Sequence, residues 1–193
     1  MTANNMIRWG APLTILGGLL LVVFAIGVNF IGESHWGFHA LNAPPNALLA
    51  LGIVGIYLYL RQQGNFGILG RIGFYICAFI FAIEAIGGVG IILADAVFGA
   101  EAIEGALDII HPLEILLVPG LILFGIGLLR YGGLARLGAM ILIAVPVLLI
   151  GGMVAFGEAD WVFSAVFALL GVGWALLGYG LQQENMQTTA AVR

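Results

Sequence analysis

The feature of this sequence that most constrains its fold is a series of long apolar segments joined by short polar connections. One of them, from Arg71 to Asp95, has about the length that spans a bilayer, and it holds a single carboxylate, Glu84, inside the run. Charged residues make up 8% of the chain, against about 25% in soluble domains. We therefore predict an all-α integral membrane protein.

There are six such apolar segments, each close to or above the minimum of about 17 residues for a transmembrane helix. They cover about 12–31, 46–60, 72–93, 112–129, 137–156 and 161–181. The polar stretches between them are too short to form a separate soluble domain. We expect residues 1–193 to form one polytopic membrane domain of six transmembrane helices.

The arginines are distributed asymmetrically over the connections, and the chain contains no lysine. They lie before the first segment, between the second and third, between the fourth and fifth, and after the sixth: Arg8, Arg61, Arg71, Arg130, Arg136 and Arg193. Connections on the other side carry acidic residues and no basic residue. The positive-inside rule places the arginine side in the cytoplasm. The sequence thus predicts an inner or plasma membrane protein with both termini cytoplasmic.

A short internal repeat accompanies this pattern. The motif Gly-x-Leu-x-Arg-x-Gly occupies residues 67–73 and again 132–138, and its Arg-x-Gly portion also opens the first segment at Arg8. The first, third and fifth segments therefore begin alike. Repetition at a fixed period is the sequence signature of repeated structural units. We predict three tandem helical hairpins, each entering from the cytoplasm and returning to it.

Glu84 is the least ordinary residue of the chain, because an ionisable group in the hydrocarbon region costs about 2.5–3.5 kcal/mol on insertion scales. Such a group normally faces a partner or a water-filled cavity. The glycines that follow it, Gly87, Gly88 and Gly90, would line a cavity for a proton or a cation. The alternative is a protonated, purely structural glutamate bonded to a backbone carbonyl or a tyrosine. Glu84 is the candidate intramembrane ion or proton site.

The three histidines fall on the non-arginine side and form a second candidate site. His35 and His39 are four residues apart and share a face if that stretch is helical, and His111 opens the fourth segment. Imidazole nitrogens ligate zinc, copper or haem iron. A metal or haem site is one interpretation, and interfacial histidines that only form hydrogen bonds are the other.

Acidic residues gather in the connection after the third segment. In residues 98–110 the acidic residues Glu101, Glu104 and Asp108 follow at spacings of three and four, and the apolar residues lie elsewhere on the helical wheel. This pattern predicts a short helix lying on the outer membrane surface. With Asp95, Asp108 and Glu114 beside it, this region would form an acidic vestibule over Glu84 that attracts cations. An ordinary charged helix start, favoured by the helix dipole, explains Glu114 equally well.

Several classes of function lack the residues they need. The chain has no phosphate-binding glycine loop, no Gly-x-Ser-x-Gly elbow and no basic patch for nucleic acid, so an enzyme is disfavoured. Its 30 glycines suit close helix packing in lipid. We favour a structural or accessory subunit that packs on other membrane proteins or on itself through glycine faces. The alternatives are a small proton- or cation-coupled transporter or channel using Glu84, and a metal- or haem-binding membrane component.

Overall fold

The computed structural model describes residues 3–27, 30, 36–64, 66–98, 113–157 and 160–191, and helix is the only regular secondary structure in this part. Its helices are α1 (Ala3–Gly27), α2 (Trp36–Gln62), α3 (Ile68–Phe98), α5 (Leu117–Leu128), α6 (Gly133–Phe156) and α7 (Asp160–Ala191). Five of them are long and apolar enough to cross a membrane. The prediction of a multi-pass, all-α membrane protein is confirmed at this level.

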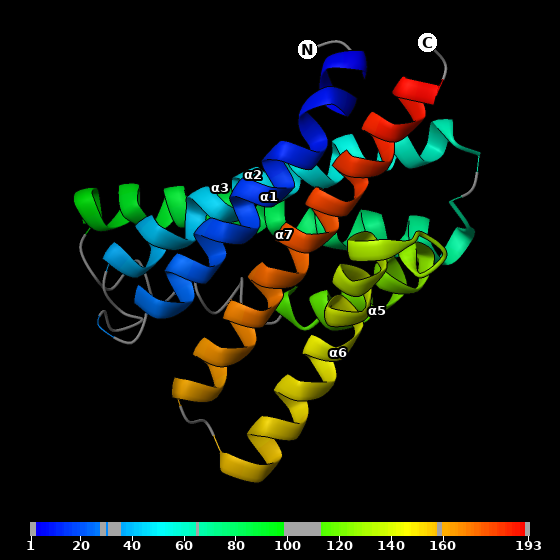
Figure 1. Cartoon of the computed structure of the whole chain (residues 1–193). Coiled ribbons are helices and arrows are strands. Elements are labelled where there is room, and N and C mark those ends of the chain that lie inside the picture. Colours follow the sequence, from blue (N-terminus) through cyan, green and yellow to red (C-terminus); the bar gives the residue numbers. More distant parts are fainter. Residues whose placement is uncertain are drawn as a thin grey trace.

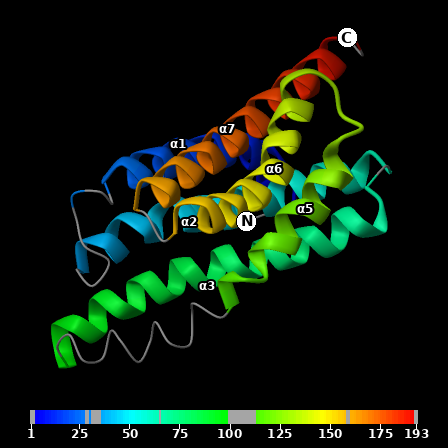
Figure 2. The ribbon, with the colours of Figure 1, turned by 90° about the horizontal axis from the view of Figure 1, so that it is seen from below.

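The helices form a closed ring in which each contacts the next along the chain and α7 contacts α1. Figures 1 and 2 show α1 and α7 side by side. Neighbours run antiparallel: Gly10 of α1 lies against Gly55 of α2, while Gly17, further along α1, lies against Leu49, earlier in α2. The start of α1 and the end of α7 share one end of the molecule (Figure 1). We call it the arginine end, because the same alternation brings to it Arg8, Arg61, Arg71, Arg130 and Arg136.

Two helices differ from the segments expected from the sequence. Helix α2 begins at Trp36, ten residues before the predicted start at 46, and it continues through Pro44 and Pro45. Helix α5 has only 12 residues, about 18 Å, although the fourth segment was predicted over 112–129. The predicted surface helix at 98–110 lies outside the described residues, apart from its first position.

Pro119 explains why α5 starts late. Proline has no backbone N–H, so it cannot donate to the carbonyl of Ile115 four residues earlier. That carbonyl instead accepts the N–H of Val118 at 3.3 Å, which tightens the chain into a turn. Leu113 and Glu114 are helical, and a turn at Ile115 and Leu116 separates them from the regular helix. The N–H of Leu116 donates to the Leu113 carbonyl across this turn at 3.0 Å.

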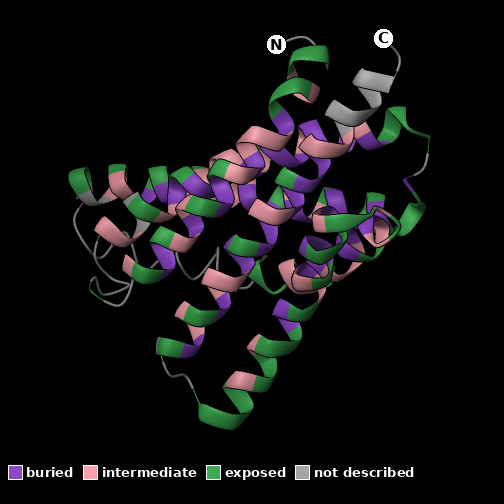
Figure 3. Ribbon diagram, in the orientation of Figure 1, coloured by how far each residue is buried: buried purple, intermediate pink, exposed green. Residues whose placement is uncertain are grey.

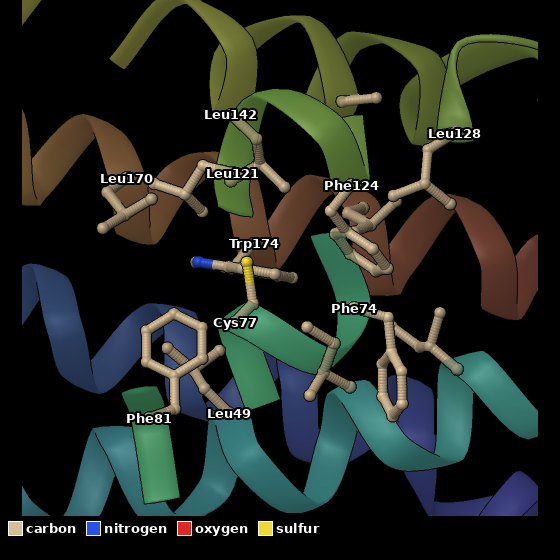
Figure 4. Packing of buried hydrophobic residues seen from close by; sticks show 14 of the residues in the cluster. Leu49, Phe74, Cys77, Phe81, Leu121, Phe124, Leu128, Leu142, Leu170 and Trp174 are labelled. Carbon is tan, nitrogen blue, oxygen red and sulfur yellow. The ribbon is translucent and has the colours of Figure 1, made fainter. Parts of the chain in front are cut away.

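Large side chains fill the middle of the ring. Trp174 of α7 is fully buried, with its ring centroid 5.5 Å from that of Phe81 and 5.7 Å from that of Phe124. Figure 4 shows these rings close to Cys77 and Leu49, so α2, α3, α5 and α7 all contribute to one cluster. In lipid such packing stabilises mainly through van der Waals contact. At the level of Trp174, side chains therefore fill the space that the helices enclose.

The glycines of the repeated Arg-x-Gly motif occupy equivalent places. Each lies where its helix crosses the next helix of the chain, so closely that an added Cβ would run into the neighbour's backbone. The atoms met belong to Gly55 for Gly10, to Phe124 for Gly73 and to Leu177 for Gly138. Close backbone approach through small residues is the usual way membrane helices associate. The repeat thus marks three tight crossings, between α1 and α2, α3 and α5, and α6 and α7.

Candidate functional site

Glu84 lies on α3 and faces α2, where two asparagines hold it. Asn42 Nδ2 donates to Glu84 Oε2 at 3.2 Å. Asn46, one helical turn later and almost completely buried, donates from Nδ2 to Asn42 Oδ1 at 2.8 Å and to the Asn42 carbonyl at 2.9 Å. The inner amide orients the outer one, which points an N–H at the carboxyl group. This row of hydrogen bonds fixes one oxygen of Glu84.

The register of α3 against α5 brings a second carboxyl group to the same place. Gly73 packs on Phe124, and moving eleven residues along the two antiparallel helices pairs Glu84 with Leu113, next to Glu114. The carboxyl groups of Glu84 and Glu114 lie close enough to interact with each other. Two carboxylates this close repel each other, and a proton on one of them would remove the repulsion and allow a hydrogen bond. The register therefore places two acids side by side.

The pair stands at a boundary between the interior and the surface. Glu84 is partly buried, and its Oε1 atom is buried with no N–H or hydroxyl donor among the described residues. Glu114, just before the turn that precedes α5, is exposed. One acid is thus partly enclosed by the bundle and the other lies at its surface.

The site lies off the centre of the membrane-spanning part. Glu84 is thirteen residues beyond Arg71, about 20 Å along the axis of α3, and Asn42 is nineteen residues before Arg61, about 29 Å along α2. The hydrocarbon core is about 30 Å thick. With the arginines at one boundary, the pair falls in the half of the membrane remote from them.

Of the other predicted site residues, most lie outside the described part. The backbone of Asp95 is three turns beyond Glu84 on α3, about 16 Å along the helix axis, so it does not belong to the pair. His39 is in α2, but its side chain is outside the description, as are Asp108, His35 and His111 altogether. The residues that are described include no group of three or more metal-ligating side chains. The metal or haem hypothesis stays a prediction.

Sequence reasoning missed Asn42 and Asn46. Their spacing of four residues was a usable signal, because on a helix it places two amides on one face. The signal was hidden because the stretch before residue 46, with Pro44 and Pro45, was expected to be a loop. The structure carries α2 through both prolines and so brings the amides to Glu84.

Between the carboxyl pair and the arginine end, the ring holds aromatic side chains and a second buried polar atom. Phe81 is one turn from Glu84, and it contacts Trp174, which contacts Phe124. Trp174 Nε1 is buried without a hydrogen-bond acceptor in the described part of the chain. Phe66, against Phe124, continues the row toward the arginine end. This row of aromatic side chains lies between the two acids and the arginine end.

The arginine end has its own polar cluster. The N–H of Gly132, in the α5–α6 connection, donates to Glu184 Oε1 of α7 at 3.2 Å. Tyr131 lies beside it, with the Arg130 guanidinium 5.9 Å from its ring centroid. Burial raises the pKa of Tyr131, Arg130 opposes this, and Tyr59 and Glu184 add to it. The phenol stays neutral at ordinary pH.

Comparison of the chain with protein-family models, with curated proteins and with solved structures found no match. The candidate site consequently rests on its own geometry.

Proposed function

We propose that this small multi-pass membrane protein binds and exchanges a proton at the Glu84–Glu114 pair, with a monovalent cation as the competing occupant. The observation that carries the proposal is the close approach of two carboxyl groups at the edge of a helical bundle, one of them oriented by Asn42. An ionisable group in this setting is costly to keep and marks ion or proton pathways in membrane proteins. A purely structural role would be served by an uncharged amide.

Each residue of the site has its own role in this proposal. Glu84 and Glu114 hold the proton, and Asn42 keeps one carboxyl oxygen in place through its N–H. When the proton leaves, two carboxylates stand side by side, and their repulsion favours entry of a cation or return of a proton. Carboxylate oxygens are ligands that suit hard cations. Exposed Glu114 provides the route of exchange with the nearby surface.

Passage to the arginine end requires a conformational step. Phe81 and Trp174 fill the ring beyond the pair, so an occupant reaches the far side only if these side chains move. A protein that exposes one site alternately to the two sides of the membrane behaves in this way. The proposal is therefore a coupled carrier rather than an open channel.

The test is proton flux into liposomes that contain the purified protein, followed with an internal pH dye under an imposed pH gradient, with sodium or potassium outside. Glu84→Gln removes the acid and keeps the shape, and we expect it to abolish the flux. Glu184→Gln, at the arginine end, is the matched control and should keep it. Unchanged flux in Glu84→Gln would refute the proposal.

A second candidate is an accessory subunit, and one observation favours it. Gly151 and Ala155, four residues apart on α6, are both exposed, and nothing lies within 4 Å of a Cβ added at Gly151. Such a pair admits a helix of another protein or of a second copy. Most other glycines behind this hypothesis, such as Gly52 and Gly171, contact helices of the same chain. Copurification of a stoichiometric partner, lost in Gly151→Leu, would support it.

We also propose that the arginine end faces the cytoplasm and that the three hairpins arose by duplication. The equivalent tight crossings at the repeated glycines support the duplication, and the arginine asymmetry supports the orientation. Because the only cysteine, Cys77, is fully buried, cysteines introduced at Gln63 and Phe156 report the two ends. In intact cells an impermeant maleimide should label Phe156→Cys and spare Gln63→Cys. The reverse result would invert the topology.

A further inference from the structure

A cavity of about 390 Å³ lies at the arginine end, between α1, α2 and α7. It is far from the carboxyl pair, at the opposite end of the bundle. Its polar lining consists of one arginine, three carboxamides and one phenol: Arg8, Asn4, Gln62, Gln182 and Tyr59. The other described residues of the wall are apolar, including Ile56 and Leu181, and none of the described lining residues carries a carboxylate.

The lining is rich in donors. A guanidinium presents five N–H groups in a fork that matches a phosphate or carboxylate, and each carboxamide adds two N–H donors. Because the described lining residues include no acid, the guanidinium of Arg8 gives this part of the wall a positive charge. An anion with several acceptor oxygens is the ligand that fits this chemistry.

Pro12 frees a backbone acceptor in a residue that lines the cavity. It lies four residues after Arg8, and because proline has no N–H, the Arg8 carbonyl lacks its usual helical donor. Both residues line the cavity. A ligand that carries a hydroxyl group beside its anionic group would satisfy this carbonyl.

Exposed aromatic rings place the cavity at the level of lipid headgroups. Trp9 of α1 and Tyr179 of α7 are 50% and 47% exposed, next in sequence to lining residues or two positions from them. Tryptophan and tyrosine concentrate at the membrane–water interface. Phosphate groups, from lipid or from solution, are available at that depth.

We propose that this cavity binds a phosphate group with a neighbouring hydroxyl, supplied by an anionic lipid headgroup or by a free phosphate ester. Arg8 binds the phosphate oxygens, Gln62 and Gln182 add hydrogen bonds, and the freed Arg8 carbonyl accepts from the hydroxyl. The inference is independent of the proton site, because it uses a different end of the ring and no acid.

The test compares two sources of the same chemistry. The protein is placed in phosphatidylcholine nanodiscs with or without phosphatidylglycerol, and lipid retention is read by native mass spectrometry. Separately, glycerol 3-phosphate is titrated into the phosphatidylcholine sample by calorimetry. Retention of phosphatidylglycerol alone assigns the lipid, and binding of glycerol 3-phosphate assigns the free ester. Absence of both overturns the proposal.

Variants decide whether the cavity is responsible. Arg8→Gln should weaken binding at least tenfold, whereas Arg136→Gln, an exposed arginine at the same end that does not line the cavity, should change it less than twofold. Equal losses in the two variants would mean non-specific attraction and would overturn the site. If Arg8→Gln does not fold, Gln182→Glu places a negative charge in the wall and should reduce binding by a similar factor. Undiminished binding in Gln182→Glu would also contradict the proposal.

Discussion

The two ends of this bundle are built differently. At the arginine end, backbones touch: Gly10 meets Gly55, and Gly70 meets Gly127, at distances only glycine allows. Toward the opposite end the helices diverge (Figure 3). There Val154 of α6, for example, is 84% exposed. We call the arginine end the tight end and the opposite end the looser end. The carboxyl pair stands on the looser side of the aromatic row.

The difference between the ends separates glycines that close helix packing requires from glycines that a larger residue could replace. Gly73 and Gly90 are on the same helix, α3, yet an added Cβ meets the Phe124 backbone at the first and open space at the second. The same contrast holds on α6 between Gly138 and Gly151. Substitution at these matched positions separates the two ends experimentally.

The largest expected effect is that of Gly73→Ala. Its methyl group would overlap the backbone nitrogen of Phe124 and lie 2.7 Å from the Leu123 carbonyl carbon, so α3 and α5 must move apart. Overpacking of this kind costs about 1–3 kcal/mol or more, and a backbone obstacle favours the upper part of that range. We expect a large fall in melting temperature in detergent. The control, Gly90→Ala, should be neutral or slightly stabilising, because alanine favours the helix. Equal effects would erase the distinction between the ends.

A somewhat smaller effect is expected for Gly138→Ala on α6. The added Cβ would lie 2.6 Å from the Leu177 nitrogen, a milder overlap with the backbone of α7. We expect destabilisation within the same range of about 1–3 kcal/mol, measured by thermal unfolding in nanodiscs. Gly151→Ala is its partner control and should match the wild type. If Gly138→Ala is as stable as Gly151→Ala, the equivalence of the repeated crossings is disproved.

At the looser end, we expect a substitution of Glu84 to abolish proton flux without lowering the stability of the fold. Glu84→Leu replaces an expensive buried acid by an apolar side chain, a change that is often neutral or stabilising. We expect its unfolding free energy to stay within about 1 kcal/mol of the wild type while proton flux is lost. Asn42→Leu instead removes a donor to Glu84 and an acceptor for Asn46, and should cost about 1–3 kcal/mol. Should Glu84→Leu be the more damaging of the two, the carboxyl group is structural and the proposed function fails.

These contrasts also show what the sequence can and cannot predict. Apolar length predicted the multi-pass helical fold because in lipid a helix is the simplest way to pair every backbone group. The cost of a buried acid drew attention to Glu84. The partnership of Glu84 with Glu114 depended on the register of α3 against α5, which is set by contacts such as Gly73 with Phe124. The Arg-x-Gly motif marks Gly73 as a place of close packing, but the residue of α5 that it meets follows from packing and cannot be deduced from the motif.

The role of Asn42 was missed for a related reason. Proline usually interrupts a helix, so Pro44 and Pro45 suggested a loop that would leave the amides in water. Buried helix contacts override that local preference here, and α2 extends beyond both prolines. The remaining hypotheses on His35, His111 and Asp108 concern residues that the structure does not describe.

The smallest expected effect is at Tyr131, and it tests the polar cluster of the tight end. The hydroxyl is buried without a well-aligned hydrogen bond among the described residues, although Arg130 lies near it. Tyr131→Phe removes this group and keeps the ring against Arg130, so at neutral pH we expect stability to change by less than about 1 kcal/mol.

The pH dependence gives Tyr131→Phe its sharper readout. Burial raises the pKa of Tyr131 in the folded protein, while in the unfolded chain the phenol titrates near its ordinary value of about 10. Below that value the stability linked to this phenol is fully present, and it is lost as the pH rises toward the folded pKa, because only the unfolded state then gains from releasing the proton. Stability measured from pH 8 to 11 should therefore fall less steeply in Tyr131→Phe than in the wild type. Parallel curves would show that Tyr131 is as solvated in the folded protein as in the unfolded chain. The close packing of the tight end would then not include the α5–α6 connection.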